Sequence, residues 1–308
     1  MLNSAFEQMP NCQYFFLDID YGKPQLEKSP IHILSLDEID LNESHRNWLR
    51  QKYNVIEFAT SVKPTLLKAL LNRGFRSVTY LDPDILVSSP ISEAISFAED
   101  YEVVVVPHRL GPQQTQHFDF EVLLNRVGMF NLGFITVSQN SKQALEWWQM
   151  KTFETGSMNW YRGQFTDQKW GDFFPAYFHT LVLKHPGYNV ALWNIDERPL
   201  SHLPSGELMA RNEPLRFLHF SQSSHRLQDI TVLERWERAN LESVPIVQSL
   251  AVKYQSNIRF AQDEIEFRTP IDKRIKFKKV RFRLNTRDGL SAGLKEDWAS
   301  VKTKIVRR

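Results

Sequence analysis

The stretch SVTYLDPDILVSS, residues 77–89, ends an apolar run with two aspartates on either side of a proline. The run is rich in β-branched and aromatic residues and is bounded by turn residues, so it predicts a strand. Asp82 is held extended by Pro83, and side chains two apart in extended backbone point the same way. Asp82 and Asp84 can therefore face one point, where a divalent cation would bind their oxygens. A solvated turn is the plainer interpretation, because Asp and Pro are ordinary turn residues.

The segments around this stretch alternate between strand and helix patterns. The predicted strands are 12–19, 30–36, 77–82, 101–109 and 130–138, and the predicted helices are 61–75, 90–100 and 141–154. Ser61 is the candidate N-cap of its helix, Pro64 lies in the first turn and Gly74 ends it. Such alternation predicts an α/β layered fold with a mostly parallel central sheet. Ligands of such sheets bind at the carboxyl ends of the strands, where Asp82 and Asp84 are expected to lie.

The composition excludes several classes of protein. A chain of 308 residues with 42% hydrophobic residues can bury one large core or two modest ones. The single cysteine, Cys12, excludes a disulfide framework and a cysteine-rich metal site. We find no signal peptide at the N-terminus and no apolar run near the ~20 residues of a membrane helix. The sequence therefore predicts a soluble, cytoplasmic protein.

Charge divides the chain into two parts. Residues 268–308 hold 14 Lys or Arg and 4 Asp or Glu, a net charge of +10; because the whole chain carries +2, residues 1–267 carry −8. We expect a domain over 1–262 and a basic extension over 263–308. In RIKFKKVRFRL, residues 274–284, cations alternate with apolar residues. This pattern fits an edge strand with a charged outer face or peripheral contact with an anionic membrane. Nucleic acid is not an expected partner.

A second acidic pair, Asp18 and Asp20 in YFFLDIDYG, competes with the first. It resembles the start of the haloacid dehalogenase-type phosphatases, whose motif continues with Thr or Val two residues after the second aspartate. Here Tyr21 and Gly22 follow instead. The phosphatase interpretation is therefore the less favoured one, and Asp18 and Asp20 are not expected to bind a metal.

Five segments in order carry a closer resemblance. They are FATSVKPTLLKALLNRGFRSVTYLDPDILV, GMFNLGFITVSQNSKQALEWW, FTDQKWGDFFPAYF, HPGYNVALWNI and LRFLHFS. Together, over about residues 10–225, they resemble bacterial nucleotide-sugar glycosyltransferases of the GT-A fold and, more distantly, glycogenin and the lipopolysaccharide galactosyltransferases. The resemblance implies a Rossmann-like three-layer fold. It also implies transfer of a sugar from a nucleoside diphosphate to a hydroxyl of a cell-surface polysaccharide or glycolipid.

The resemblance also implies roles for individual residues. The metal ligands would be Asp82, Asp84 and His219, a set that suits Mn²⁺ or Mg²⁺. The donor or substrate contacts would be Lys63, Asn131, Asn189 and Trp193. The catalytic residues would be Asp167 and Gln168. Asp167 is the candidate base if the enzyme inverts the anomeric carbon, whereas the distant galactosyltransferase resemblance favours retention.

Two departures from the family pattern bear on activity. The strand and loop that grip the nucleotide base in relatives are expected to be missing at the N-terminus, and Gln222 replaces the glycine that follows the HFS motif. A non-catalytic member of the fold that binds a carbohydrate or a protein is therefore the main alternative. Four tryptophans are either sugar platforms or core residues, namely Trp147, Trp148, Trp170 and Trp193.

Overall fold

The structure is a computed structural model, and it describes residues 1–19, 30–112, 120–221 and 244–264. The chain divides into two compact units, Met1–Lys278 and Lys279–Arg308, and every described residue belongs to the first. Asp20, Gln222 and the cation-rich stretch predicted at 274–284 lie outside the described residues.

The central sheet is mixed. Its four strands, in the order β3, β6, β5 and β7, span Ser77–Leu81, Phe130–Ser138, Val103–Pro107 and Thr180–Val182. β6 runs antiparallel to both β3 and β5, whereas β5 and β7 are parallel. The predicted α/β class is confirmed, but a mostly parallel sheet is not. Alternating strands and helices do not fix strand direction, and one strand, β6, enters between β3 and β5 in the opposite sense.

Three smaller sheets complete the β-structure of the described residues. β1 (Tyr14–Asp18) pairs in parallel with β2 (Ile31–Ser35). β4 (Ile85–Val87) pairs antiparallel with β11 (Phe217–His219). β8, β9 and β10 form an antiparallel sheet over Leu200–His202, Leu208–Ala210 and Glu213–Pro214.

The helices are mostly short. The α-helices are α1 Leu2–Gln8, α2 Glu43–Lys52, α3 Val55–Ser61, α4 Lys63–Asn72, α5 Ser92–Phe97, α6 Phe120–Val127, α7 Lys142–Thr155, α8 Phe174–Tyr177 and α10 Val244–Glu264. The 3₁₀ helices are η1 Leu36–Ile39, η2 Gln139–Ser141, η3 Trp160–Arg162 and η4 Gln168–Phe173. None of the helices in the described ranges has the length and apolar content needed to cross a membrane.

The helix predicted at 61–75 is α4, with one correction at its start. Ser61 is not the N-cap: it is the last residue of α3, and its hydroxyl donates to the Phe58 carbonyl at 2.8 Å. The N-cap is Val62, which has helical backbone angles and no capping side chain, because α3 turns directly into α4. The predictions for Pro64 and Gly74 are confirmed: Pro64 lies in the first turn, and Gly74 has φ +96° just past the end.

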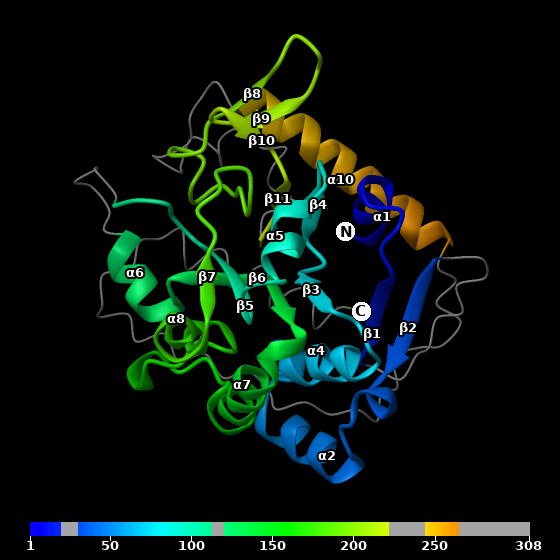
Figure 1. The fold of residues 1–308 in the computed structure, drawn as a ribbon, viewed down its shortest axis with the longest axis vertical. Helices are drawn as coiled ribbons and strands as arrows, with labels where there is room; N and C mark the ends of the chain where they lie inside the picture. The colour runs from blue at the N-terminus through cyan, green and yellow to red at the C-terminus, as the bar shows by residue number, and fades with distance from the viewer. Residues whose placement is uncertain (20–29, 113–119, 222–243, 265–308) are drawn as a thin grey trace. The chain divides into compact units, whose positions relative to one another are not determined.

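The core lies where α4 and α7 pack against each other and against the sheet (Figure 1). All five residues of β5 and all nine of β6 are buried, as their apolar runs require. Trp148 is fully buried, and Trp147 and Trp170 pack edge-to-face within the aromatic cluster that flanks it. Trp148 is therefore a core residue, and Trp147 and Trp170 are half-buried side chains that pack against the core.

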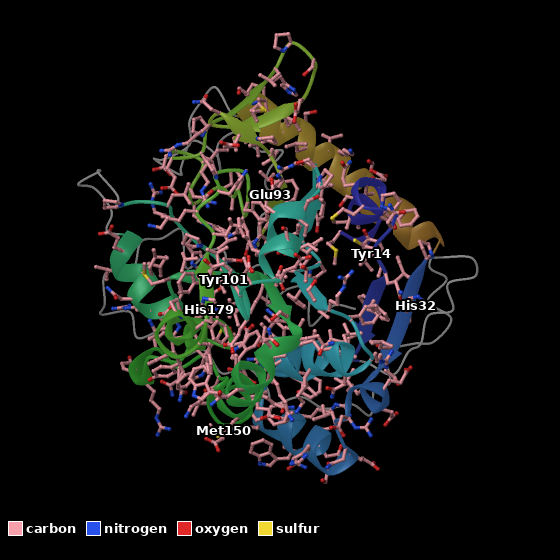
Figure 2. All side chains as sticks on the ribbon, in the orientation of Figure 1. Tyr14, His32, Glu93, Tyr101, Met150 and His179 are labelled. Carbon is pink, nitrogen blue, oxygen red and sulfur yellow. The ribbon has the colours of Figure 1, made fainter. Side chains whose placement is uncertain are left out.

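An aromatic pair lies at the amino ends of two neighbouring strands of the central sheet. Tyr101 and His179 precede β5 and β7, and their rings stack with centroids 4.6 Å apart. Both residues are labelled in Figure 2. The Glu102 backbone N–H donates to the His179 carbonyl at 2.9 Å, and the His179 N–H donates to the Glu102 carboxylate at 3.1 Å. These contacts hold together the beginnings of the two parallel strands β5 and β7.

Candidate metal centre

The Asp82–Asp84 turn is held by backbone hydrogen bonds on both sides. The Asp82 N–H donates to the Gly133 carbonyl on β6 at 2.8 Å, and the Ile85 N–H closes the turn onto the Asp82 carbonyl at 3.2 Å. β4 begins directly after the turn, and its first residue, Ile85, lies opposite His219 on β11. The Phe220 N–H then donates to the Asp84 carbonyl at 2.9 Å. The pairing of β4 with β11 therefore places His219, which is distant in sequence, next to the two aspartates.

Asp82, Asp84 and His219 meet at one point, as the resemblance implied. Their ligand atoms all lie within 4.8 Å of one another. His219 Nε2 is 2.9 Å from Asp84 Oδ1 and 4.0 Å from Asp82 Oδ2. Two carboxylates and an imidazole are ligands that Mn²⁺ and Mg²⁺ accept.

The space beside these three ligands depends on Gly133. A Cβ on this residue would lie 2.6 Å from His219 Cε1 and 2.7 Å from Asp82 Oδ2. Real Cβ atoms do not come so close to other atoms, so any other residue would push the ligands apart. The residues fit a small hard cation by the chemistry of their donor atoms, and the missing side chain of Gly133 lets these atoms lie close to β6.

Lys63 lies beside the aspartates in a buried ion pair. Its Nζ is 2.8 Å from Asp167 Oδ2 and 3.9 Å from Asp82 Oδ1, and it donates to the Leu132 carbonyl at 2.7 Å. Lys63 is 3% exposed and Asp167 is 2% exposed. Burial alone would lower the pKa of Lys63, but the Asp167 and Asp82 carboxylates outweigh it and raise the pKa above the usual value. A fixed positive charge therefore sits next to the candidate metal site.

The same electrostatics act on the ligands. Burial would lower the pKa of His219, but Asp84, followed by Asp82, raises it above its ordinary value. Burial would raise the pKa of Asp84, and the nearby His219 lowers it instead. The contact with Asp84 thus favours the protonated form of His219, and a metal that binds Nε2 would compete with that proton.

Asn131 is oriented by a histidine that sequence reasoning missed. Asn131 Oδ1 accepts from the Gly133 N–H at 3.0 Å, and its Nδ2 donates to His108 Nε2 at 3.3 Å. His108 Nδ1 donates to the Met129 carbonyl at 3.2 Å. Burial lowers the pKa of His108 to about 4, so the ring is neutral and its two nitrogens keep distinct roles. The available signal was the place of His108 at the carboxyl end of the buried strand β5.

The segment after β7 supplies residues on the other side of His219. The Trp193 ring meets the His219 ring edge-on, with centroids 5.6 Å apart. Asn189 Oδ1 accepts from His219 Nδ1 at 3.1 Å. Asn189 Nδ2 and Trp193 Nε1 are buried, and neither has a hydrogen-bond partner among the described residues. Two N–H groups therefore remain available beside the ligands.

The turn is also supported from α10, which the sequence did not predict. Tyr254 stacks on Phe220 with ring centroids 4.6 Å apart, and its hydroxyl donates to the Pro83 carbonyl at 3.5 Å. Val247, Leu250 and Ala251 from the same helix pack in one cluster with Leu218 on β11. α10 thus covers β11 and backs the acidic turn.

Not every predicted site residue contacts the triad. Gln168 donates through Nε2 to the Val127 carbonyl at 2.8 Å, which ties η4 to the end of α6. Among the described residues, Asp82, Asp84 and His219 form the group that could hold a metal, and Asp18 is not part of it. Asp18 is instead the buried last residue of β1.

Comparison with known proteins finds similar solved structures but no match in sequence. No protein-family model matches the chain, and no curated protein matches it in sequence. The galactosyltransferase LgtC, solved in complex with donor and acceptor sugar analogues, is similar with 15% identity and a TM-score of 0.47, over 77% of this chain and 87% of that chain. An active-site mutant of LgtC is similar with 14% identity and a TM-score of 0.45, over 77% of this chain and 88% of that chain.

Proposed function

We propose that this protein is a metal-dependent glycosyltransferase of the GT-A fold. It moves a sugar, of hexosyl type, from a nucleoside-diphosphate donor to a hydroxyl acceptor. The observation that carries the proposal is the convergence of Asp82, Asp84 and His219 within 4.8 Å at the end of β3. The five ordered motifs that include these residues support it from the sequence.

The chemistry follows from the charges at the site. A Mn²⁺ or Mg²⁺ ion held by the two carboxylates and the imidazole would neutralise the donor diphosphate and make it a better leaving group. Lys63 holds its positive charge 3.9 Å from Asp82 and so lies where it can add to the binding of the diphosphate. Asn189 Nδ2 and Trp193 Nε1 are the donors that could bind sugar hydroxyls, whereas Asn131 would act through the backbone that it holds at Gly133.

The surroundings of Asp167 differ from those expected of a general base that is free to reach the acceptor. Its carboxylate is buried and paired with Lys63 at 2.8 Å, which fits a role in holding Lys63. A base for an inverting reaction must reach the acceptor hydroxyl. If Asp167 is that base, Asp167→Asn abolishes transfer and the product is inverted. If it positions Lys63, the same change weakens donor binding instead.

The acceptor and location are proposed from charge. A net charge of +10 over residues 268–308 would favour peripheral contact with the inner face of an anionic membrane. A glycolipid or lipid-linked glycan precursor would be met there. Such an acceptor fits a cytoplasmic enzyme of cell-surface polysaccharide synthesis.

The test is a thermal-shift and calorimetric screen of nucleoside diphosphates with and without Mn²⁺. We expect at least one nucleotide to bind only with the metal. Asp84→Ala should abolish that binding while leaving the fold intact, because a half-buried turn carboxylate adds little to packing. Asp100→Ala, an exposed acid after α5, is the matched control and should bind as the parent does.

Two outcomes would contradict the proposal. Nucleotide affinity that does not change on adding EDTA would rule out the metal centre as the donor site. Binding of glycans without any nucleotide binding would favour the alternative, a non-catalytic member of the fold that binds carbohydrate.

A further inference from the structure

We propose that Tyr80 and Asn189 are positioning residues of the metal centre. Each binds the atom of a ligand side chain that faces away from the candidate metal position, and so fixes the atom that faces it. The inference rests on the metal centre of the proposed function, and it adds two residues that touch ligands rather than the metal.

Tyr80 acts on Asp82. The two residues are two apart at the end of β3, so their side chains lie on the same face. The Tyr80 hydroxyl donates to Asp82 Oδ1 at 2.8 Å. The other oxygen, Oδ2, is the one that lies 4.0 Å from His219 Nε2 and beside the space at Gly133. With Oδ1 bound, the carboxylate cannot rotate without losing a hydrogen bond, and Oδ2 stays directed at His219 Nε2.

Tyr80 is itself held in place. Lys63 Nζ lies 4.2 Å from the centroid of its ring, a cation–π contact between two buried or half-buried groups. The same Lys63 Nζ is bound by Asp167 and by the Leu132 carbonyl. The ring of Tyr80 thus lies against a lysine that Asp167 and the Leu132 carbonyl hold in place, while the hydroxyl donates to Asp82.

Asn189 acts on His219. Its Oδ1 accepts from His219 Nδ1 at 3.1 Å, which leaves Nε2 directed at Asp84 and Asp82. Once a metal occupies Nε2, the remaining ring proton is on Nδ1, and Asn189 Oδ1 is the atom placed to accept it. This contact fixes both the tautomer and the plane of the ring once the metal takes Nε2.

The backbone of Asn189 is also held in place by hydrogen bonds. The residue is fully buried and has φ +52°, the left-handed region that Asn tolerates better than other non-glycine residues. Its carbonyl accepts from Asn194 Nδ2 at 3.0 Å and from the Arg198 guanidinium at 3.3 Å. A strained residue held by two buried side chains is a fixed support for the imidazole.

Hydrogen bonds of this kind change metal affinity more than they change stability. Removing an outer partner of a metal ligand weakens metal binding by about 10- to 100-fold. Loss of a single hydroxyl or amide from an otherwise intact fold is a smaller change for the whole protein. The two effects can therefore be separated by measuring each.

The experiment titrates Mn²⁺ into the full chain and follows binding by calorimetry and by the electron paramagnetic resonance signal of the ion. Tyr80→Phe removes one hydroxyl, and Asn189→Gly removes the amide while keeping the left-handed backbone. Asn189→Asp keeps the acceptor oxygen. Tyr101→Phe, the stacked tyrosine labelled in Figure 2, is the control for loss of a phenol elsewhere. Urea unfolding of every variant separates lost affinity from lost fold.

We expect Mn²⁺ affinity to fall at least about tenfold in Tyr80→Phe and in Asn189→Gly, with an altered resonance line shape from the bound ion. Asn189→Asp should restore affinity to within about threefold of the parent, and Tyr101→Phe should not change it.

Parent-like affinity and line shape in both test variants would overturn the inference. So would a parent protein that binds no Mn²⁺, which also removes the metal centre. Mn²⁺ binding without nucleotide binding would leave this inference standing and contradict only the proposed function. If one test variant fails to fold, the other decides.

Discussion

His108 shows how a residue that touches no metal ligand can shape the site. Its neutral ring accepts from Asn131 Nδ2 and donates to the Met129 carbonyl, so it fixes the direction of the Asn131 amide. Asn131 in turn accepts from the N–H of Gly133, the residue whose missing side chain leaves room for the cation. Protonation of His108 Nε2 would break its hydrogen bond with Asn131 Nδ2.

Acid should therefore destabilise the protein through His108. Burial lowers its pKa to about 4, whereas an unfolded histidine has a pKa of about 6.5. The stabilisation is complete above pH 6.5 and is lost as the pH falls towards 4, because the unfolded chain binds the proton first. Between pH 7 and pH 5 this histidine should contribute a loss of about 2 kcal/mol in the free energy of unfolding.

The measurement compares urea unfolding of the parent and of His108→Gln at both pH values. Glutamine keeps an acceptor near Asn131 but does not titrate, so the gap between the two proteins should shrink in acid. His219, whose raised pKa has the opposite sign, is present in both proteins and cancels. Parallel stability profiles for parent and variant would show that His108 is not the titrating group.

At the scale of elements, Arg198 joins the end of β5 to the turn that carries Asn189. It is fully buried, and its guanidinium donates to the carbonyls of Pro107 at 3.1 Å, His108 at 3.3 Å and Tyr188 at 2.5 Å. Burial lowers its pKa to about 10, which still leaves it charged near neutral pH. Within the part of the chain that the structure describes, the ladder of β5 with β7 ends at Val105 and Val182, and Arg198 joins the segments that follow.

Arg198→Met should cost about 3–5 kcal/mol in the free energy of unfolding, because it removes the side-chain donor to the buried Pro107 and Tyr188 carbonyls and one of the partners of Glu197. Urea unfolding at neutral pH measures the change. Arg162→Met removes an exposed arginine at the end of η3 and should change stability by less than about 0.5 kcal/mol. A loss below about 1 kcal/mol in Arg198→Met would mean that water takes over the carbonyls.

The elements differ in how well the sequence predicts them, and the reasons are physical. β1, β2, β3, β5, β6, α4, α5 and α7 were all predicted, because each has an apolar period of its own. β4 and β11 are three residues each and exist only because they pair with each other. The reversed direction of β6 has no local signal, since strand direction depends on where the chain re-enters the sheet.

The candidate site divides in the same way. The spacing of Asp82 and Asp84 predicted their shared direction from local geometry alone. Lys63 and His219 were reached only through the family resemblance, because their partners lie far away in the sequence. Tyr80, His108 and Arg198 were missed, since a tyrosine in a strand or a buried arginine shows its role only when its hydrogen-bond partner is known.

At the scale of the whole molecule, charge is unevenly divided along the chain. Residues 268–308 carry +10 and residues 1–267 carry −8, although the total is only +2. Four acids cannot neutralise 14 cations within 41 residues, so the segment should attract external anions. Anionic lipid headgroups are one such source, at about 1 kcal/mol for each cation near the surface.

We therefore expect the full chain to cosediment with anionic vesicles at low salt and to be released at about 0.5 M salt, because salt screens charge attraction. A chain that ends at Asp263 lacks all 14 of these cations and should stay in the supernatant. Neutral vesicles are the control for contact through apolar groups. If salt releases the full chain but the truncated chain also binds the vesicles, the contact lies within residues 1–263. If both chains stay in the supernatant at low salt, the cations of the tail have another role, and the acceptor need not be at a membrane.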